Sequence, residues 1–313
     1  MNNQTGHPLK IIFLGSSGAI QVPSFHCSCT VCEAARRDPQ QRRTRASLGL
    51  LGRETTLIDA SPDLEFQLER QMIRRVDRIF ITHWHFDHIA GLGALAEPSS
   101  HALGPPANID DPGALDHRTF NAGFSGDANS ESHVVLYRET DSLNPWAPID
   151  IYAPRPVMHH FDQELAYIRS RINLHPIEPG DCLTLPDATW EVVKTDHNEE
   201  SVGFIIEANQ RFAYLVDGIT PPPQTMRRLT NLDFVILEAT MDELDENWKN
   251  FSLEEAVACW KQIGAKRCIL THLSCHSWKD HRLIAGFSHE QRMAYETHTP
   301  GLTFAYDGMS FVI

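Results

Sequence analysis

The sequence has no run of about 18 apolar residues, the length that a helix needs to cross a membrane. The apolar run near its N-terminus, Ile11–Leu14, is too short for the core of a signal peptide, and no small-residue cleavage site follows it. Both absences predict a cytoplasmic protein with no membrane partner.

Basic residues are scarce relative to acidic ones. There are 27 Lys and Arg against 41 Asp and Glu, which gives a formal net charge of -14. Such a chain gains no general electrostatic attraction to nucleic acid, so a nucleic-acid partner is not expected. The hydrophobic share of 42% and the charged share of 22% are ordinary for a globular protein and exclude a disordered or fibrous chain. Histidine is abundant by contrast, and 17 of them raise the question of metal binding.

Short runs rich in β-branched and apolar residues predict strands, and apolar residues at helical spacing predict two helices. The first helix is expected over Pro62–Arg75. The second begins after Ser252, which forms a capping-box pattern with Glu255, and ends at Gly264. Grouped strands with helices between some of them indicate sheets covered by helices, an α/β class of fold. The predicted strands are Leu9–Gly15, Thr55–Asp59, Arg78–Thr82, Val202–Glu207, Phe212–Val216, Phe234–Leu237, Cys268–Leu270 and Leu302–Tyr306.

One segment, residues 97–150, differs from the rest in composition. It is rich in Pro, Gly, Ser, Asn and Asp, and its nine acidic and two basic residues carry half of the net charge of the chain. We interpret it as an insertion in a single domain that spans residues 1–313. It is either a surface segment or a cover for the active site, a role that long loops without periodicity often have.

The strongest chemical signal is the segment 82–88, which directly follows a predicted strand. His83, His85, Asp87 and His88 place four ligating side chains within six residues. On a turn that leaves a strand end, these side chains can converge on one point. Zinc and similar ions accept imidazole nitrogen and carboxylate oxygen. The segment therefore predicts a metal site, with enough ligands to serve two ions.

The His-x-His-x-Asp-His spacing of residues 83–88 resembles the signature of the metallo-β-lactamase superfamily, and the resemblance extends through most of the chain. It implies an αβ/βα sandwich, with two mixed sheets packed face to face, helices outside and the metals at one edge. Members of the superfamily supply their remaining ligands later in the chain, each from the end of a strand. The candidates here, in the expected order, are His197, Asp217 and His272.

The resemblance also implies how the ligands divide between two ions. Two ions about 3.5–4 Å apart can hold a bridging hydroxide and stabilise charge on a phosphate or carbonyl oxygen. Zinc and manganese both suit a mixed set of nitrogen and oxygen ligands. Asp87 is expected to assist proton movement as well. The expected sets are His83, His85 and His197 for the first ion, Asp87, His88 and His272 for the second, and Asp217 as the bridge.

Three of the seven cysteines crowd together as Cys27, Cys29 and Cys32, and without an export signal such a cluster indicates a metal site before disulfide bonds. With the Gly-rich segment before it, the cluster resembles the PhnP subgroup, cyclic-phosphate phosphodiesterases in which these cysteines hold a structural zinc. The subgroup completes that site with a His three residues after the last catalytic histidine. This chain has Cys275 there, so a four-thiolate zinc site is expected, with His276 as the alternative fourth ligand.

Two further segments resemble neighbouring subgroups. Residues 59–63 and 306–310 are similar to PqqB of quinone-cofactor biosynthesis, although PqqB has lost much of the metal motif that is whole here. Residues 237–240 resemble a segment of tRNase Z in which the glutamate orients a catalytic histidine. Glu238 is therefore a candidate for that role, and the alternative is a plain carboxylate at a strand end.

Several aromatic residues near the motif have less specific patterns. Trp84 and Phe86 are expected to pack under or beside the metals, and stacking on a base or sugar of the substrate is the alternative. His159 and His160 are expected to be surface or structural residues, and phosphate binding is the alternative for this pair.

Together these patterns predict a metal-dependent hydrolase with two active-site ions and one structural zinc, acting on a small cyclic or nucleotide-like phosphodiester. One alternative is hydrolysis of a thioester, lactone or amide by the same centre. The other is a PqqB-like carrier without catalytic activity, against which the complete ligand set argues. A homodimer is compatible with all three.

Overall fold

The computed structural model describes residues 8–93, 148–240, 249–279 and 282–313, and for residues 276–279 and 282–285 the backbone alone. Apart from positions 148–150, the predicted insertion lies outside the described residues. Within the described ranges, no helix is long and apolar enough to cross a membrane.

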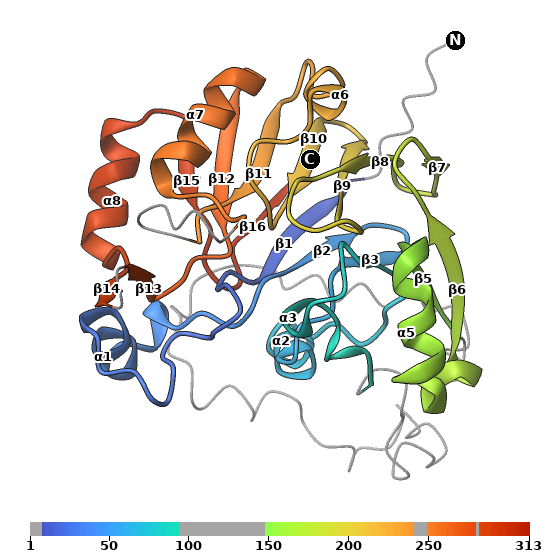
Figure 1. Cartoon of the computed structure of the whole chain (residues 1–313), viewed down its shortest axis with the longest axis horizontal. Helices are drawn as coiled ribbons and strands as arrows, with labels where there is room; N and C mark the ends of the chain where they lie inside the picture. Colours follow the sequence, from blue (N-terminus) through green and yellow to red (C-terminus); the bar gives the residue numbers. More distant parts are fainter. Residues whose placement is uncertain (1–7, 94–147, 241–248, 280–281) are drawn as a thin grey trace, which may run out of the picture. The chain divides into compact units, whose positions relative to one another are not determined.

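Two mixed sheets, each of seven strands, form the body of the described chain (Figure 1). In the first sheet, β16, β1, β2 and β3 pair in antiparallel fashion, and β3 to β6 run parallel. The order of this sheet is β16 (Ser310–Val312), β1 (Lys10–Gly15), β2 (Ser47–Leu51), β3 (Thr55–Ile58), β4 (Arg78–Phe80), β5 (Ile149–Pro154) and β6 (Ile172–Ile177).

The second sheet combines the two pairing types in the same way. Strands β7 to β10 are antiparallel, whereas β10, β11, β12 and β15 are parallel. Its order is β15 (Leu302–Phe304), β12 (Arg267–Thr271), β11 (Phe234–Glu238), β10 (Arg211–Leu215), β9 (Val202–Glu207), β8 (Thr189–Lys194) and β7 (Cys182–Thr184). A separate hairpin pairs β13 (His276–Lys279) with β14 (Arg282–Ala285).

The main core lies between the two sheets. Phe80 of β4 stacks on Trp190 of β8 with ring centroids 4.1 Å apart, so the two sheets meet through aromatic side chains. In β9, Val202 and Phe204 belong to this core, whereas Ile205 belongs to the cluster on the other face of the sheet. Because successive side chains of a strand point to opposite faces, a strand buried on both faces must be apolar throughout.

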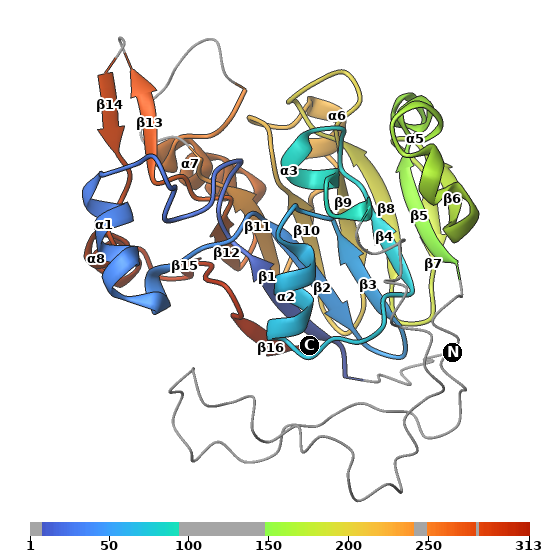
Figure 2. The same cartoon turned by 90° about the horizontal axis from the view of Figure 1, so that it is seen from below.

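Helices cover the outer faces of both sheets (Figures 1 and 2). Leu64 and Leu68 of α2 (Leu64–Arg70) and Phe161 of α5 (Met158–Gln163) are buried against the first sheet. On the second sheet, Ala256 and Val257 of α7 (Leu253–Ile263) are buried, and Tyr295 of α8 (His289–His298) packs edge-on against Phe304 of β15. The arrangement confirms the predicted αβ/βα sandwich. The remaining helices are α1 (Thr30–Arg37), α3 (Phe86–Ile89) and α6 (Pro223–Met226), with 3-10 turns at Pro39–Gln41, Arg155–Val157 and Ala166–Arg171.

The predicted elements are present, with changes at their ends. The helix α7 has the predicted capping box at Ser252 and ends at Gly264, whose φ of 74° is left-handed. The first predicted helix is shorter than expected, because α2 ends at Arg70 and Met72 has a left-handed φ of 53°. Several short strands, such as β7 with its largely exposed residues, carry no clear periodicity and were missed.

The carboxyl ends of parallel strands from both sheets meet at one edge, the usual position of ligand sites in such folds. In the first sheet, β3 leads to Asp59 and β4 leads to the segment 82–88. In the second sheet, β10 leads to Asp217, β11 ends at Glu238 and β12 leads to His272.

Candidate metal centres

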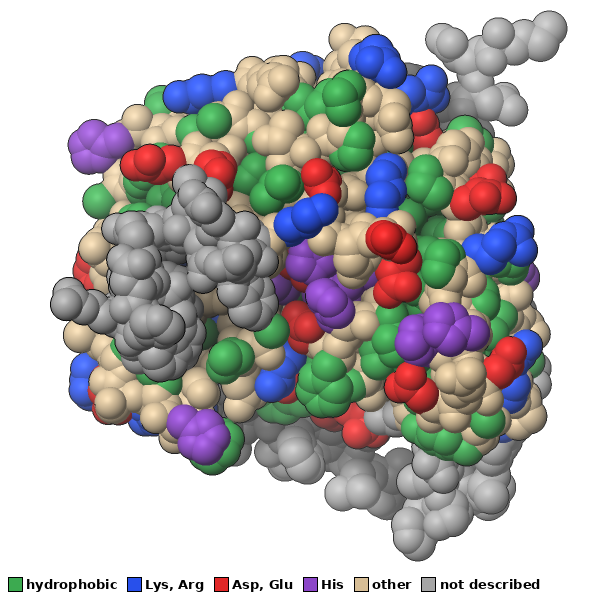
Figure 3. All heavy atoms as spheres, in the orientation of Figure 1, with side chains coloured by type: hydrophobic (Ala, Val, Ile, Leu, Met, Phe, Trp, Pro, Cys, Tyr) green, Lys and Arg blue, Asp and Glu red, His purple; other side chains and the backbone are tan. Residues whose placement is uncertain are grey.

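The seven side chains predicted as active-site ligands come together in two groups that share Asp217. In each group, one ligand atom from every residue lies within 4.8 Å of the others. Figure 3 shows histidine side chains gathered near the middle of one face of the molecule. The groups are His83, His85, His197 and Asp217, and Asp87, His88, Asp217 and His272.

Two buried nitrogens in this cluster fit a bound cation. Nε2 of His83 and Nε2 of His88 have no hydrogen-bond partner among the described residues. The Asp217 carboxylate lies 3.4 Å from the first and 3.1 Å from the second. Burial, together with the neighbouring His88, holds the pKa of His83 well below its usual value. A neutral imidazole next to a carboxylate is the form that binds a divalent ion, so this donor set suits one.

The two carboxylates of the cluster are ionised. Burial alone raises the pKa of the Asp217 carboxyl, but His272 and His88 outweigh it and hold that pKa below its usual range. The pKa of Asp87 is lowered in the same way, against burial, by His88 and His272. Against burial, these carboxylates in turn raise the pKa of His88 and hold that of His272 at about 9. A divalent ion bound here would displace the protons of these two imidazoles and take their place beside the carboxylates.

Three residues at this edge have a left-handed backbone, which non-glycine residues rarely adopt. The φ angles are 63° at Asp59, 61° at Asp217 and 56° at His272. Such a conformation costs on the order of 1–3 kcal/mol, and it persists where the surrounding structure and the required side chain outweigh that cost. Gly218 follows Asp217 with φ at 139°, where a Cβ atom would lie 3.1 Å from the Asp196 carbonyl oxygen. The loops are thus shaped to deliver particular side chains to the centre.

Asp59 holds two of the candidate ligands in place. Its Oδ2 lies 2.7 Å from Nδ1 of His88, and Oδ1 accepts a hydrogen bond from the Thr82 backbone at 2.8 Å. The Thr82 hydroxyl donates to the same carboxylate and lies 2.9 Å from Nδ1 of His83. A carboxylate on the outer nitrogen of a ligating histidine fixes its tautomer and its orientation. This role of Asp59 was not predicted, although Asp59 follows an apolar strand as Asp217 does.

Glu238 lies 3.8 Å from Nδ1 of His272 and makes its hydrogen bonds to groups around the cluster. It is fully buried, and its Oε1 accepts hydrogen bonds from the Gly218 backbone at 2.7 Å and from Asn250 at 2.9 Å. The hydroxyl of Thr240 donates to its other oxygen and lies 2.7 Å from Nδ1 of His272. Burial, with a contribution from Asp217, raises the pKa of Glu238 to about 7. Glu238 therefore steadies the loop of Asp217 and, through Thr240, the ring of His272. The parts played by Thr240 and Asn250 were not predicted.

The cluster is open on the side of His85 and His197. Nδ1 of His85 lies 3.2 Å from Nε2 of His197, whose other nitrogen lies 3.0 Å from the Lys249 carbonyl oxygen. Phe86 is 67% exposed, so the expectation that it packs beside the metals is wrong.

Trp84 and His160, near the motif, pack against each other. Trp84 stacks on His160 with ring centroids 4.5 Å apart, and it packs against the buried cluster outside the first sheet. Nδ1 of His160 lies 2.8 Å from a Glu164 oxygen. These contacts give His160 a structural role.

The cysteines form a second candidate centre. The Sγ atoms of four cysteines all lie within 4.8 Å of one another, namely those of Cys27, Cys29, Cys32 and Cys275. Cys29 caps α1, where its sulfur accepts a hydrogen bond from the Cys32 backbone. The side chain of His276, the alternative ligand, lies outside the described residues.

This second centre joins two segments that are distant in sequence. The helix α1 lies beside the β13–β14 hairpin (Figure 2). The Leu273 backbone N–H donates to the Ser16 carbonyl oxygen at 2.8 Å, and the Ser17 hydroxyl donates to the Leu273 carbonyl oxygen at 3.2 Å. The loop that carries His272 and Cys275 is thereby attached to the end of β1.

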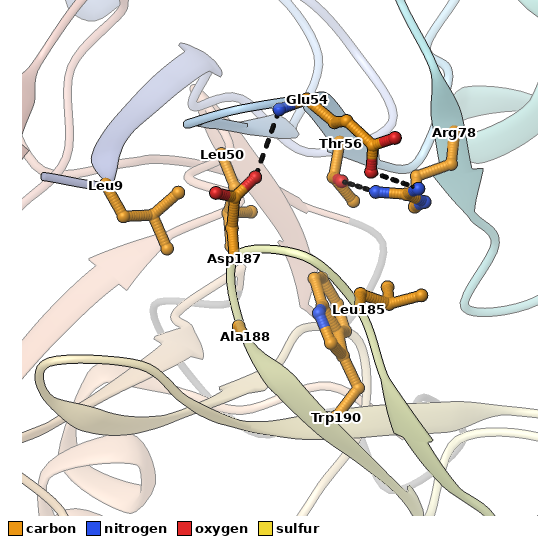
Figure 4. A pocket seen from close by; sticks show the side chains of 9 residues that line it. All are labelled: Leu9, Leu50, Glu54, Thr56, Arg78, Leu185, Asp187, Ala188 and Trp190. Carbon is orange, nitrogen blue, oxygen red and sulfur yellow. Dashed lines mark hydrogen bonds and ion pairs between the residues drawn. The ribbon is translucent and has the colours of Figure 1, made fainter. Parts of the chain in front are cut away.

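A separate pocket lies at the opposite ends of β3 and β4, near Thr56 in the first residue pair of the two strands and Arg78 at the start of β4 (Figure 4). Several of its polar groups are paired with one another. Arg78 donates to Glu54 and, at 3.3 Å, to the Thr56 hydroxyl, and the Glu54 backbone N–H donates to Asp187 at 3.1 Å. This pocket is distinct from both candidate metal centres.

An αβ/βα sandwich with histidine and aspartate ligands at one edge defines a class of divalent-metal-binding proteins. Residues 48–250 match the model of the Metallo-beta-lactamase superfamily, and the chain belongs to this superfamily.

Curated relatives differ in name. Coenzyme PQQ synthesis protein B of Methylobacterium radiotolerans is 25% identical over 247 residues, which cover 74% of this chain and 73% of that protein. An octanoyltransferase of Porphyromonas gingivalis is 38% identical over 316 residues, which cover 97% of this chain. The match spans 52% of that octanoyltransferase, or about half its length.

Solved structures show the same fold. A diphosphatase from the PhnP family has a TM-score of 0.72 at 23% identity, covering 98% of this chain and 97% of that one. Zinc-bound PqqB from Methylobacterium extorquens has a TM-score of 0.69 at 16% identity, covering 96% and 99%. The short form of human tRNase Z has a TM-score of 0.58 at 18% identity, covering 96% and 98%.

Proposed function

We propose that the protein is a metal-dependent hydrolase of a small cyclic or nucleotide-like phosphodiester. The observation that carries this proposal is the shared carboxylate. Because Asp217 belongs to both ligand groups, two ions bound there would be close neighbours. Such a pair supplies an activated water and stabilises negative charge on a phosphoryl oxygen. The likeness in fold to a PhnP-family diphosphatase supports a phosphate ester as the substrate.

The ligands have different duties in this proposal. Asp217 would bridge the two sites and offset part of their charge. Asp87, ionised at neutral pH, would bind the second ion and could take up a proton from the attacking water on its other oxygen. The first ion, zinc or manganese, would be held by His83, His85 and His197, and the second by Asp87, His88 and His272.

The open side of the centre is where a substrate would enter. Phe86 lies between two ligand positions in the chain and is largely exposed. An exposed aromatic ring there offers an apolar face for the organic part of a phosphodiester. Because Phe86 stands directly between the candidate ligands His85 and Asp87, we assign it to substrate contact.

Hydrolysis of bis(p-nitrophenyl) phosphate tests the proposal. The chain should turn this ester over with added zinc or manganese, and Asp217→Asn should reduce both the rate and the content of active-site metal by at least about tenfold. Asp233→Asn is the matched control, since Asp233 precedes β11 at the far end of the sheet and accepts a backbone hydrogen bond from Arg211. Absence of turnover with every metal would refute the phosphodiesterase proposal, and so would full activity in Asp217→Asn.

A second candidate, hydrolysis of an acyl thioester, is favoured by one observation. The chain aligns along nearly all of its length with half of a protein named octanoyltransferase. Octanoyl thioesters belong in the same assay for that reason. Turnover of the thioester without turnover of the phosphodiester would decide for this candidate. Metal binding with turnover of neither would favour a PqqB-like carrier.

We also propose that Cys27, Cys29, Cys32 and Cys275 hold a structural zinc. Four sulfurs within 4.8 Å of one another fit a closed tetrahedral site. Metal analysis should find about three ions per chain, two in the active site and one here. A Cys29→Ser variant should lose one of them and keep the active-site pair, and unchanged metal content in this variant would contradict the assignment.

A further inference from the structure

Arg43 is a buried cation without a partner. Its side chain is 3% exposed, and none of its three guanidinium nitrogens has a hydrogen-bond partner within the described part of the chain. A buried charge is expensive unless an opposite charge or a set of hydrogen bonds compensates for it. Burial, together with the nearby Arg292, lowers the pKa of Arg43 to about 9. The guanidinium is still charged at neutral pH, so the folded protein needs an anion beside it.

The backbone of Arg43 pairs with a residue that packs against the cysteine centre. Arg43 forms backbone hydrogen bonds to Val22 at 2.8 Å in both directions, and Val22 belongs to the buried cluster of Cys27, Cys32 and Cys275. The charge of Arg43 also interacts with Cys32 and Cys275.

The other charged groups near Arg43 do not neutralise it. Arg292 of α8 has the same sign and is 9% exposed. The Asp307 carboxylate attracts Arg43, but its hydrogen bonds go elsewhere. They come from the Ser16 hydroxyl at 2.9 Å, from the backbone and hydroxyl of Thr44 at 2.8 and 2.6 Å, and from Arg70 at 3.1 Å.

Metal binding changes the charge of the cysteine centre. Cysteines bind metals as thiolates, so four of them with one divalent ion carry a net charge of about −2. We propose that the Arg43 guanidinium is the counter-charge of this four-thiolate centre and raises its affinity for a divalent metal. The inference rests on the structural metal site proposed above and is independent of the hydrolase activity.

This role explains why a four-thiolate site can be buried here. A centre of three thiolates and one neutral histidine carries one negative charge fewer than a four-thiolate centre. With Cys275 as the fourth ligand in place of a histidine, the centre has this additional negative charge. Three of the four cysteines are buried, so water screens the added charge poorly. A fixed cation in the same interior supplies the compensation that solvent does not.

The test compares three variants of the full chain, with cobalt(II) and zinc as the probes. Thiolate-to-cobalt absorption reports on the cysteine centre separately from the histidine and aspartate ligands, and zinc competition then gives its affinity. Arg43→Met should weaken metal binding at this centre roughly 10- to 100-fold, whereas Arg43→Lys, which keeps the charge, should stay within about threefold of the parent. Arg78→Met is the control, since Arg78 is a buried arginine in the pocket at the far end of β4.

The stability of the metal-free protein distinguishes charge compensation by Arg43 from a role in packing alone. Removing an uncompensated buried cation should leave the metal-free Arg43→Met variant at least as stable as the metal-free parent. A metal-free variant that is destabilised while its affinity stays within twofold of the parent would overturn the proposal. If Arg43→Met does not fold, a loss of more than about tenfold in Arg43→Lys would overturn it too, because the charge is still present. A parent chain whose cysteines bind no metal would refute this inference and the structural site together, with phosphodiester turnover still decided by its own assay.

Discussion

Replacement of Asp59 by Asn removes one carboxylate beneath the candidate active site. The carboxylate is fully buried, and it accepts hydrogen bonds from the backbone and the hydroxyl of Thr82 while lying 2.7 Å from Nδ1 of His88. Asn has nearly the same shape and tolerates the left-handed backbone, whose φ is 63° at this position. The substitution therefore changes the chemistry of the contact more than its geometry.

The expected effect follows from the tautomer of His88. When Nδ1 donates a hydrogen bond to the Asp59 carboxylate, Nε2 is the nitrogen that would bind an ion. If the amide oxygen of Asn keeps the bond from the Thr82 backbone, its NH2 group faces Nδ1, which must then accept, and the proton moves to Nε2. A ligand in the wrong tautomer should cost about 10- to 100-fold in metal affinity, or roughly 1.4–2.7 kcal/mol.

Chelator competition on the purified protein measures this loss, and phosphodiester hydrolysis reports it as activity. The control is Asp77→Asn, because Asp77 precedes β4 at the opposite end of the same strand pair and accepts a hydrogen bond from the Thr55 backbone at 2.7 Å. If Asp59→Asn bound active-site metal as tightly as Asp77→Asn, the reasoning about the tautomer would be refuted.

Three further substitutions test other contacts of the centre. Thr240→Val removes the hydroxyl 2.7 Å from Nδ1 of His272 and should lower the affinity for the second ion by about tenfold, measured as metal retained on dialysis; full retention would show that Thr240 does not position the ring. Phe86→Ala should raise KM for an aryl or nucleoside phosphodiester several-fold with little change in kcat, and an unchanged KM would exclude substrate contact. For Glu238, the pKa of about 7 in the folded chain lies above the ordinary value of 4.5, so the folded protein retains a proton that the unfolded chain has released. The free energy of unfolding of the metal-free protein should therefore fall by about 1.4 kcal/mol per pH unit between those values, and Glu238→Gln should flatten that slope, as denaturant unfolding across the pH range will measure.

The ligands were accessible to sequence reasoning because their chemistry is local. Residues 83–88 gather their side chains on a single turn, and Cys27, Cys29 and Cys32 are set by the start of one helix. The later ligands, Asp217 among them, follow apolar strands, and a strand end is visible in the sequence even where its neighbour in space is not. The capping box at Ser252 belongs to the same local kind of signal.

The groups that hold those ligands were not accessible in this way. Asp59 reaches His88 across 29 positions of sequence, and Thr240 reaches His272 across 32. No spacing rule connects such pairs, because the pairing of β3 with β4 and of β11 with β12 brings them together. Phe86 illustrates the same limit, since alternation within a motif does not tell which side of a turn faces solvent.

The sequence by itself determined which side chains are available as candidate metal ligands and their order along the strand ends. The tertiary structure determined which charged groups are buried near one another. It brought Asp59 to Nδ1 of His88 and brought the N-terminal cysteines close to Cys275. It also buried the Arg43 guanidinium without a hydrogen-bond partner among the described residues. The physical reason is that ligand types follow from side-chain chemistry, which the sequence specifies, whereas compensation of buried charge depends on distances between segments that only folding sets.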